Sequence, residues 1–272
     1  METRQHNQIR LAQNFLTRPK LVRRLIEMST IGSSDTVYEI GPGNGIITAE
    51  LARVAKQVIA IEKDPELVRR LRERFRPLDN IEIVEEDFLT YRVRSSEYKI
   101  FANIPYNITA RILSKIVHER PNLDEAYLIL QKEAAQKFSG TPRETLCSIL
   151  AKPLFEFQIV TRLRRTDFRP VPNVDSVLLS IKRRSHALLP NQDIAPFRDF
   201  VQYGFKRWKP NLRLAYKHIV TYKQWKRLAH DAGFPLNATP TELSFEQWLH
   251  LYRTCMKSVG NPTREVKLCS PE

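Results

Sequence analysis

The first two thirds of the chain alternate between short apolar runs and stretches whose apolar positions recur at helical spacing. The apolar runs predict five strands, at 35–40, 57–61, 80–84, 98–102 and 125–130. Helices are expected at 21–31, 46–55, 65–75 and 108–119. Two later runs, at 155–163 and 176–184, predict an antiparallel pair of strands. Because this alternation is typical of a mainly parallel sheet covered by helices, we predict an α/β fold with seven strands.

The pattern changes after about residue 185. Segment 186–196 contains two prolines and no periodicity, which predicts a linker. Beyond it the apolar positions again indicate helices, and Ser244 is expected to cap the last of them. We therefore predict two domains, an α/β domain over 1–184 and a small helical domain over 185–272.

The charge of the chain indicates its class of partner. The sequence has 44 lysines and arginines against 30 acids, a formal net charge of +14. Such a surplus favours nucleic acid as partner, with solubility as the alternative reading. Positions 161–230 alone hold 16 basic and four acidic residues, which predicts a phosphate-binding surface there. Trp208 and Trp225 lie among these charges, and we interpret both as anchors of helix packing rather than as base-stacking residues.

The sequence does not indicate a metal-binding, membrane or secreted protein. Cys147, Cys255 and Cys269 form no C-x-x-C pair, and the six histidines show no metal-ligand spacing, so we expect no metal. No apolar stretch approaches the roughly 20 residues of a membrane helix, and the N-terminal residues do not resemble a secretory signal. We expect a monomeric cytoplasmic protein with no membrane partner.

Three glycines follow the first predicted strand of the sheet and precede a helix, in VYEIGPGNGIITAEL. Gly41, Gly43 and Gly45 would let the backbone approach a nucleotide, and the helix N-terminus offers unpaired N–H groups. Ile46 stands where a nicotinamide-binding motif has its third glycine. This difference favours an adenosyl cofactor such as S-adenosylmethionine, with a ligand-free tight turn as the alternative.

Acids stand at the ends of the next two strands. Glu62 lies 21 residues after Gly41, where a carboxylate accepts hydrogen bonds from both ribose hydroxyls of a nucleotide. Asp87 ends the third strand and could accept from the amine of a cofactor adenine, a role for which Glu85 and Glu86 compete. In open α/β sheets this carboxyl edge is where ligands bind.

The fourth strand delivers Asn103-Ile104-Pro105-Tyr106 to the same edge. An adenine amine is a poor nucleophile, because its lone pair is delocalised into the ring. Two acceptors, the Asn103 side-chain oxygen and the backbone carbonyl of Ile104 or Pro105, would orient the amine for attack on a methyl group. Tyr106 would stack on the extruded base, worth about 1–3 kcal/mol, and Pro105 would stiffen the turn.

These motifs together resemble one family. AQNFL, EIGPGNG, IEKD, EEDF, NIPYNIT and FRPVPNVDSVL occur in the order and spacing of the ribosomal RNA adenine N6-methyltransferases. The chain looks most like the erythromycin-resistance group, which modifies one adenine of 23S rRNA in the peptidyl-transferase region. The housekeeping group, which dimethylates two adenines of 16S rRNA, more often has Leu at the position of Ile104 and Gly at that of Ala12.

The resemblance assigns roles to individual residues. It implies cofactor binding by six residues, Asn14, Leu16, Gly41, Glu62, Asp87 and Asn103, and we add Gly43 from the glycine turn. It also implies that Phe168 holds the target base opposite Tyr106, although the sequence alone favours a core position for this ring. The catalytic residues we expect are Asn103, Pro105, Tyr106 and Phe168.

The resemblance also implies the activity. Residues 1–184 would bind S-adenosylmethionine in a Rossmann-like methyltransferase fold, and 185–272 would bind RNA. The expected reaction is N6 methylation of an adenine in 23S rRNA, naked or in precursor subunits, conferring macrolide, lincosamide and streptogramin B resistance. The alternatives are the 16S rRNA reaction, a DNA adenine methyltransferase, or a non-catalytic RNA-binding protein, against which the intact Asn103–Tyr106 motif argues.

Overall fold

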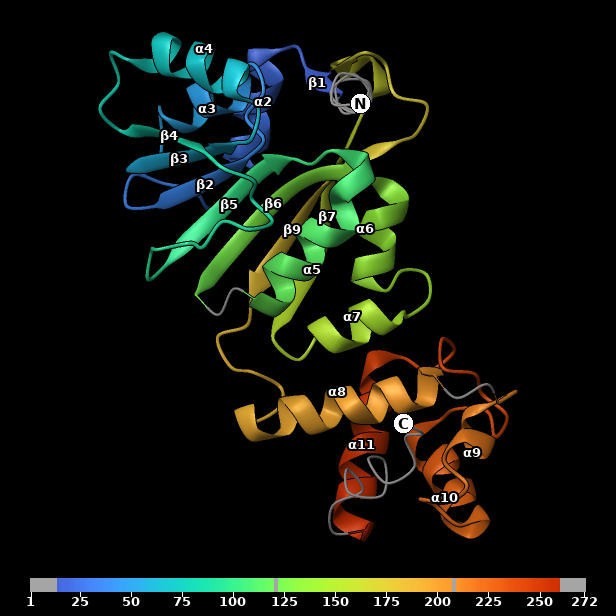
Figure 1. Cartoon of the computed structure of the whole chain (residues 1–272). Coiled ribbons are helices and arrows are strands. Elements are labelled where there is room, and N and C mark those ends of the chain that lie inside the picture. Colours follow the sequence, from blue (N-terminus) through green and yellow to red (C-terminus); the bar gives the residue numbers. More distant parts are fainter. Residues whose placement is uncertain (1–13, 120–121, 207–208, 260–272) are drawn as a thin grey trace, which may run out of the picture. The chain divides into compact units, whose positions relative to one another are not determined.

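A seven-stranded sheet forms the centre of the first of two compact units (Figure 1). The computed structural model describes residues 14–119, 122–206 and 209–259. The predicted seven-stranded α/β fold is confirmed, with the spatial strand order β4-β3-β2-β5-β6-β9-β7. The strands are β2 (Thr36–Ile40), β3 (Gln57–Glu62), β4 (Ile81–Glu85), β5 (Tyr98–Asn103), β6 (Leu123–Gln131), β7 (Phe155–Leu163) and β9 (Ser176–Arg183).

The parallel part of the sheet brings the predicted site residues to one edge. Strands β4, β3, β2, β5 and β6 pair in parallel, whereas β9 runs antiparallel to β6 and has β7 beside it. In this register Ile40 lies opposite Ile61, Glu62 opposite Glu85, and Asn103 opposite Ile129. The glycine turn, Glu62 and Asn103 therefore meet at the carboxyl edge.

Helices cover the sheet because successive residues of a buried strand point to opposite faces. Phe101 on β5 packs in one cluster with Val22 of α2 (Pro19–Glu27) and Leu51 of α3 (Ile46–Leu51). Its neighbour Ile100 points to the other face, which α5 (Thr109–Glu119) covers (Figure 1). Helix α4 (Pro65–Phe75) contacts β3 and β4.

A second, two-stranded sheet joins segments that lie far apart in the sequence. Strand β1 (Phe15–Leu16) pairs antiparallel with β8 (Phe168–Arg169), so that Leu16 lies opposite Phe168. The Thr17 backbone N–H also donates to the Asp167 carbonyl at 3.3 Å. This pairing holds the start of the described chain beside the FRPVP segment, a contact that neither segment indicates by itself.

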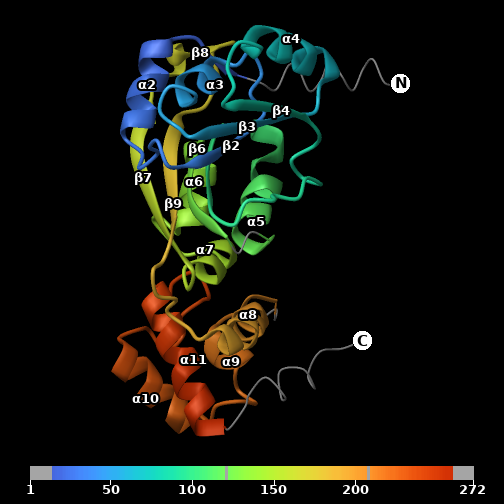
Figure 2. The same cartoon turned by 90° about the vertical axis from the view of Figure 1, so that its left-hand side faces the viewer.

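The second unit comprises 136–155 and 184–272, and its helices surround a core of their own (Figure 2). Trp225 and Trp248 are fully buried there, and their indole N–H groups donate to the Leu236 and Pro240 carbonyls, both at 3.0 Å. Trp225 is thus a packing anchor as expected, whereas Trp208 and Cys269 lie outside the described residues. The helices are α7 (Leu146–Ala151), α8 (Asn191–Lys206), α9 (Leu212–Ala215), α10 (Tyr222–Ala232) and α11 (Phe245–Val259), while α6 (Lys132–Ser139) begins in the first unit.

Helix α8 corrects the linker expected at 186–196. It begins at Asn191 and continues through Pro196, because Phe197, Phe200 and Val201 on one of its faces are buried in the core of this unit. At the other end of the unit, Ser244 caps α11 as predicted, since its hydroxyl accepts from the Gln247 backbone N–H at 3.3 Å. Among the described residues no helix combines the length and apolarity needed to cross a membrane.

Candidate functional site

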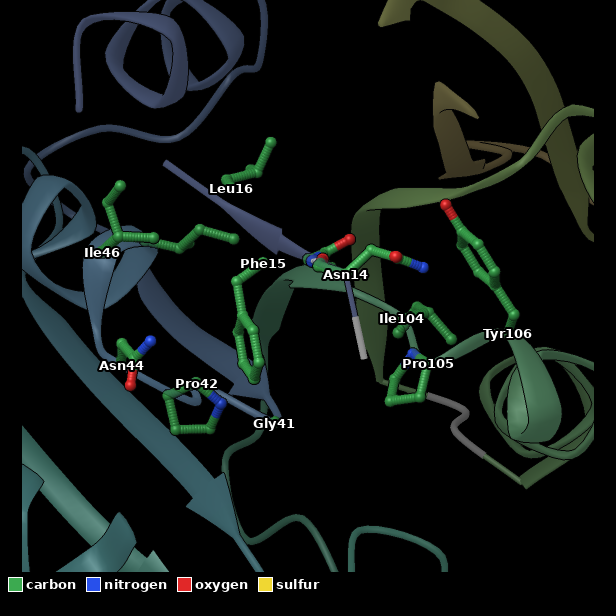
Figure 3. A pocket seen from close by; sticks show the side chains of 12 residues that line it. Asn14, Phe15, Leu16, Gly41, Pro42, Asn44, Ile46, Ile104, Pro105 and Tyr106 are labelled. Carbon is green, nitrogen blue, oxygen red and sulfur yellow. Dashed lines mark hydrogen bonds between the residues drawn. The ribbon is translucent and has the colours of Figure 1, made fainter. Parts of the chain in front are cut away.

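A small pocket lies at the carboxyl edge of the sheet, entirely within the first unit (Figure 3). Its volume is about 30 Å³, room for a few water molecules only. Six of the residues with a predicted role line it, namely Asn14, Leu16, Gly41, Asn103, Pro105 and Tyr106. The others are Phe15, Pro42, Asn44, Ile46, Ile47 and Ile104, of which the sequence had indicated only Ile104 as a site residue.

The Asn103 side chain is held by its amino group. Its Nδ2 donates to the backbone carbonyl of Asn14 at 2.7 Å, across 89 residues of sequence. The oxygen of the same carboxamide, which can only accept, receives no hydrogen bond from the described residues. Asn103 Oδ1 is therefore available as an acceptor at the pocket, as the proposed orientation of an adenine amine requires.

The hydrogen bonds of the turn decide between the two backbone carbonyls that the sequence left open. The Pro105 carbonyl already accepts from the Ile108 backbone N–H at 3.2 Å and from Thr109 Oγ1 at 3.1 Å. Ile104 is buried and its N–H donates to the Ile129 carbonyl at 2.9 Å, which fixes its peptide at the end of β5. The Ile104 carbonyl is thus the better candidate for the second acceptor.

Tyr106 is anchored through its hydroxyl. Its oxygen lies 2.8 Å from Ser176 Oγ, and Ser176 is only 2 % exposed at the start of β9. Burial raises the pKa of Tyr106, and hydrogen bonds to Ser176 and Asn14 oppose that rise. The phenol is therefore neutral at physiological pH, and its ring is held at the pocket in an orientation set by two partners.

The glycine turn approaches its neighbours closely. Gly41, Gly43 and Gly45 all have positive φ, a conformation that side chains with a Cβ rarely adopt. A Cβ at Gly43 would lie 2.6 Å from the Phe15 ring, whereas a Cβ at Gly41 would meet no atom within 4 Å. The backbone at Gly41 is thus open to a ligand, and Phe15 packs on the turn next to it.

Phe15 takes up much of the pocket, where its ring lies between Gly41 and Pro105 (Figure 3). The ligand expected at this edge of the sheet is an adenosyl group. The residues fit such a group in chemistry, since an open glycine backbone, Asn103 and Glu62 stand at one edge.

Three residues with predicted cofactor contacts do not line the pocket. Gly43 faces Phe15, and its N–H donates to Glu62 Oε2 at 3.3 Å. Glu62 is buried and also accepts from the Lys63 and Asp64 backbone N–H groups at 2.9 and 3.1 Å. Asp87 follows β4 and caps the next turn by accepting from the Leu89 N–H at 2.8 Å. Their contacts with a ribose and an adenine remain predictions.

Phe168 lies in the core of the first unit. Its ring is 0 % exposed and belongs to the cluster that contains Leu16, Val22 and Phe101. The physical reason is its pairing with β1, which turns the side chain toward the core while the neighbouring Arg169 is exposed. The structure thus places Phe168 where the sequence alone favoured it, and its contact with a target base remains a prediction.

The sequence reasoning missed Glu39, a buried acid on β2 two residues before Gly41. Its side chain is 1 % exposed, its Oε2 accepts from Thr48 Oγ1 at 2.6 Å, and its Oε1 has no hydrogen-bond partner among the described residues. Burial, with a contribution from nearby Glu62, raises the pKa of Glu39 to about 8. Burial also raises the pKa of Glu62, although backbone N–H groups oppose that rise.

The raised pKa of Glu39 predicts a pH-dependent stability. Between pH 4.5 and about 8 the folded protein holds a proton on Glu39 that the unfolded chain has lost. As the pH rises through that window, this group therefore lowers the free energy of unfolding by up to about 1.4 kcal/mol for each pH unit. Above the window its contribution no longer changes with pH. Urea unfolding from pH 5 to 9 should show that Glu39→Gln gains stability relative to the parent as pH rises.

The exposed carboxylate of Glu27 provides the control for this measurement. Glu27→Gln makes the same chemical change at a side chain exposed to water, where no burial favours a neutral carboxyl, so its stability difference from the parent should vary less with pH. A stability difference between Glu39→Gln and the parent that varies with pH as little as that of the control would show that Glu39 is ionised in the folded protein.

Comparisons with known proteins find related sequences and a related solved structure. The profile of the ribosomal RNA adenine dimethylase family matches residues 4–257. An rRNA adenine N-6-methyltransferase of Saccharopolyspora erythraea is 32 % identical over 92 % of this chain, which spans 65 % of that relative. The ribosomal RNA small subunit methyltransferase A of Chlorobium phaeobacteroides is also 32 % identical, over 93 % of this chain and 94 % of its own length. The crystal structure of the 23S rRNA methyltransferase ErmE superimposes with a TM-score of 0.82 at 32 % identity, covering 88 % of this chain and 98 % of that one.

Proposed function

The chain belongs to the ribosomal RNA adenine dimethylase family, and from that premise we propose that it methylates N6 of one adenine in 23S rRNA. The family match and the curated relatives support an rRNA adenine N6-methyltransferase that uses S-adenosylmethionine, and they argue against the DNA-directed and non-catalytic readings. The finer target is supported by the superposition on ErmE and by Ile104, which stands where the 16S enzymes more often have Leu.

The geometry of Asn103 is the observation that best supports this mechanism. S-Adenosylmethionine supplies an electrophilic methyl group on its sulfonium. Asn103 Oδ1 and the Ile104 carbonyl would accept the two N–H groups of the target amine, which directs the nitrogen lone pair toward that methyl. Neutral acceptors suffice, because the departing proton becomes acidic only after the transfer.

Other residues of the pocket would bind and orient the two reactants. The Gly41 backbone and Glu62 would hold the cofactor, and the Tyr106 ring would stack on the target adenine. Because Asn14 and Ser176 fix the phenol, the ring needs no reordering when the base arrives. We further propose that the enzyme is a cytoplasmic monomer whose second unit binds RNA phosphates and that its product confers resistance to macrolide, lincosamide and streptogramin B antibiotics.

Primer extension on rRNA from bacteria that express the chain tests the target. We expect one new stop in the peptidyl-transferase region of 23S rRNA, together with a raised minimum inhibitory concentration of erythromycin. Cells that express Asn103→Ala should show neither effect. New stops at two neighbouring adenines near the 3′ end of 16S rRNA would contradict the proposal and assign the enzyme to the small-subunit reaction.

A further inference from the structure

A basic groove lies on the first unit, outside the pocket described above. It has a volume of about 480 Å³ and is formed by α2, the end of β7 and the residues that follow β7. Five of its side chains are cationic, namely Arg18, Lys20, Arg24, Arg162 and Arg164. Leu21, Leu25 and Met28 supply apolar surface, and Asp167 is the one acid that lines it.

Most of this positive charge is not neutralised by the residues that the structure describes. Asp167 pairs with Arg18 and also accepts from the Arg164 backbone N–H at 2.9 Å, so its charge is used locally. Within the described residues no ion pair involves the side chains of Lys20, Arg24, Arg162 and Arg164, all of which are exposed. Other arginines of the unit behave differently, since Arg69 and Arg70 on α4 both pair with Glu66.

The groove is linked to the methylation site by a short, extended piece of chain. Asn14 lines the pocket and Arg18 lines the groove, with β1 between them. Four residues of extended chain span at most about 13 Å. β8 lies along the same path, because it pairs with β1. A strand of a few nucleotides could therefore reach from a base in the pocket to the groove.

We propose that this groove binds the backbone phosphates of RNA nucleotides that flank the target adenine. This inference rests on the proposed function for the identity of the RNA. Unpaired arginines and lysines around a hollow fit successive phosphates, and the apolar surface fits sugars or an unstacked base. The groove would thereby set the register of the substrate, whereas Asn103 and Tyr106 act on the base itself.

The groove also bears on which unit carries the excess of basic residues that the sequence predicts to bind RNA. Part of the basic segment 161–230 belongs to the first unit and not to the helical one. These residues are Arg162, Arg164, Arg165, Arg169, Lys182 and Arg183. RNA binding would then involve the catalytic unit directly and would not be confined to the helical unit.

Charge reversal on both walls of the groove tests the proposal. For the double variant Arg24→Glu/Arg162→Glu we expect at least about tenfold weaker binding of a 23S rRNA transcript. The slope of log affinity against log salt concentration should fall by about 1 to 2, because two phosphate contacts are lost. The affinity for S-adenosylmethionine and the rate at saturating RNA should stay within about twofold of the parent. Arg24→Gln/Arg162→Gln should show a smaller loss of the same kind, which covers the case that the charge-reversal variant folds poorly.

The control variant carries the same charge change elsewhere on the first unit. Lys56→Glu/Arg76→Glu replaces two exposed cations that line neither the pocket nor the groove. Its RNA affinity should fall less than threefold. Equal losses in the two double variants would mean that only the overall charge matters and would overturn the groove as a binding site. Unchanged binding by the groove variant would do the same and would leave the surface to a protein partner.

Shortened substrates give a sharper form of the same test. Removing the flanking nucleotides on one side of the methylated adenine should weaken binding to the parent but hardly to Arg24→Glu/Arg162→Glu, because the variant has already lost that contact. The proposal would be overturned if the parent and the variant lost equal RNA affinity, whichever side of the adenine the nucleotides were removed from. A parent that binds the transcript but transfers no methyl group to it would refute the proposed 23S target, while these affinities would still report on the groove.

Discussion

Replacing Asn103 by Ala should reduce methyl transfer by about 10²- to 10³-fold or more while leaving both substrates bound. The variant loses the oxygen that accepts from the target amine, and such an acceptor acts most strongly when the amine becomes a nucleophile. It also leaves the Asn14 carbonyl without its 2.7 Å donor. Single-turnover transfer of labelled methyl to RNA, with separate titrations of cofactor and RNA, measures these effects.

Two further variants make the result specific to the carboxamide. Asn103→Asp keeps an oxygen but loses the donor to Asn14, so we expect it to remain strongly impaired. Asn107→Ala removes an exposed amide only four residues away and should transfer methyl at a rate within about threefold of the parent. Full activity in Asn103→Ala would contradict the role of this side chain. A loss caused only by weaker RNA binding would assign Asn103 to substrate binding and not to chemistry.

Replacing Trp248 by Ala should destabilise the second unit by about 3–5 kcal/mol. The indole is 0 % exposed, stacks on Phe205 with ring centroids 5.8 Å apart, and donates to the Pro240 carbonyl. Gly204 allows this packing, since a Cβ there would lie 2.8 Å from the indole. Urea unfolding followed by near-ultraviolet circular dichroism should show an earlier transition, and RNA affinity should fall at 37 °C.

The separate cores of the two units predict what this variant retains. Because the pocket and its supporting cluster lie in the first unit, the affinity for S-adenosylmethionine should change little. Trp248→Phe keeps an aromatic ring and should lose less, about 1–2 kcal/mol. Tyr222→Ala, which removes an aromatic side chain that is 62 % exposed in the same unit, should change stability by less than about 0.5 kcal/mol. A loss below 1 kcal/mol in Trp248→Ala would show that the core tolerates the cavity.

Strands were predictable because their signal is local. The apolar runs at 35–40 and 57–61 became β2 and β3, and the run 65–75 became α4 with the same bounds. Helices α6 and α7 were not predicted, because short helices in a long connection carry little periodic signal. The linker expected at 186–196 was partly wrong for a related reason. A proline ends a helix only when burial of the surrounding residues does not favour the helical conformation. At Pro196 the apolar face of α8 is buried in the core of the second unit, so the helix continues through the proline.

The sequence by itself determined the α/β sheet, the order of the motifs at its carboxyl edge and hence the family, since these depend on neighbouring residues and on strand direction. Only the tertiary structure decided which atoms of those motifs are available. The hydrogen bond from Asn103 to Asn14, the occupied Pro105 carbonyl, the burial of Phe168 against β1 and the buried Glu39 all arise from partners in other elements. Such partners are set by how the elements pack, and no local pattern in the chain records them.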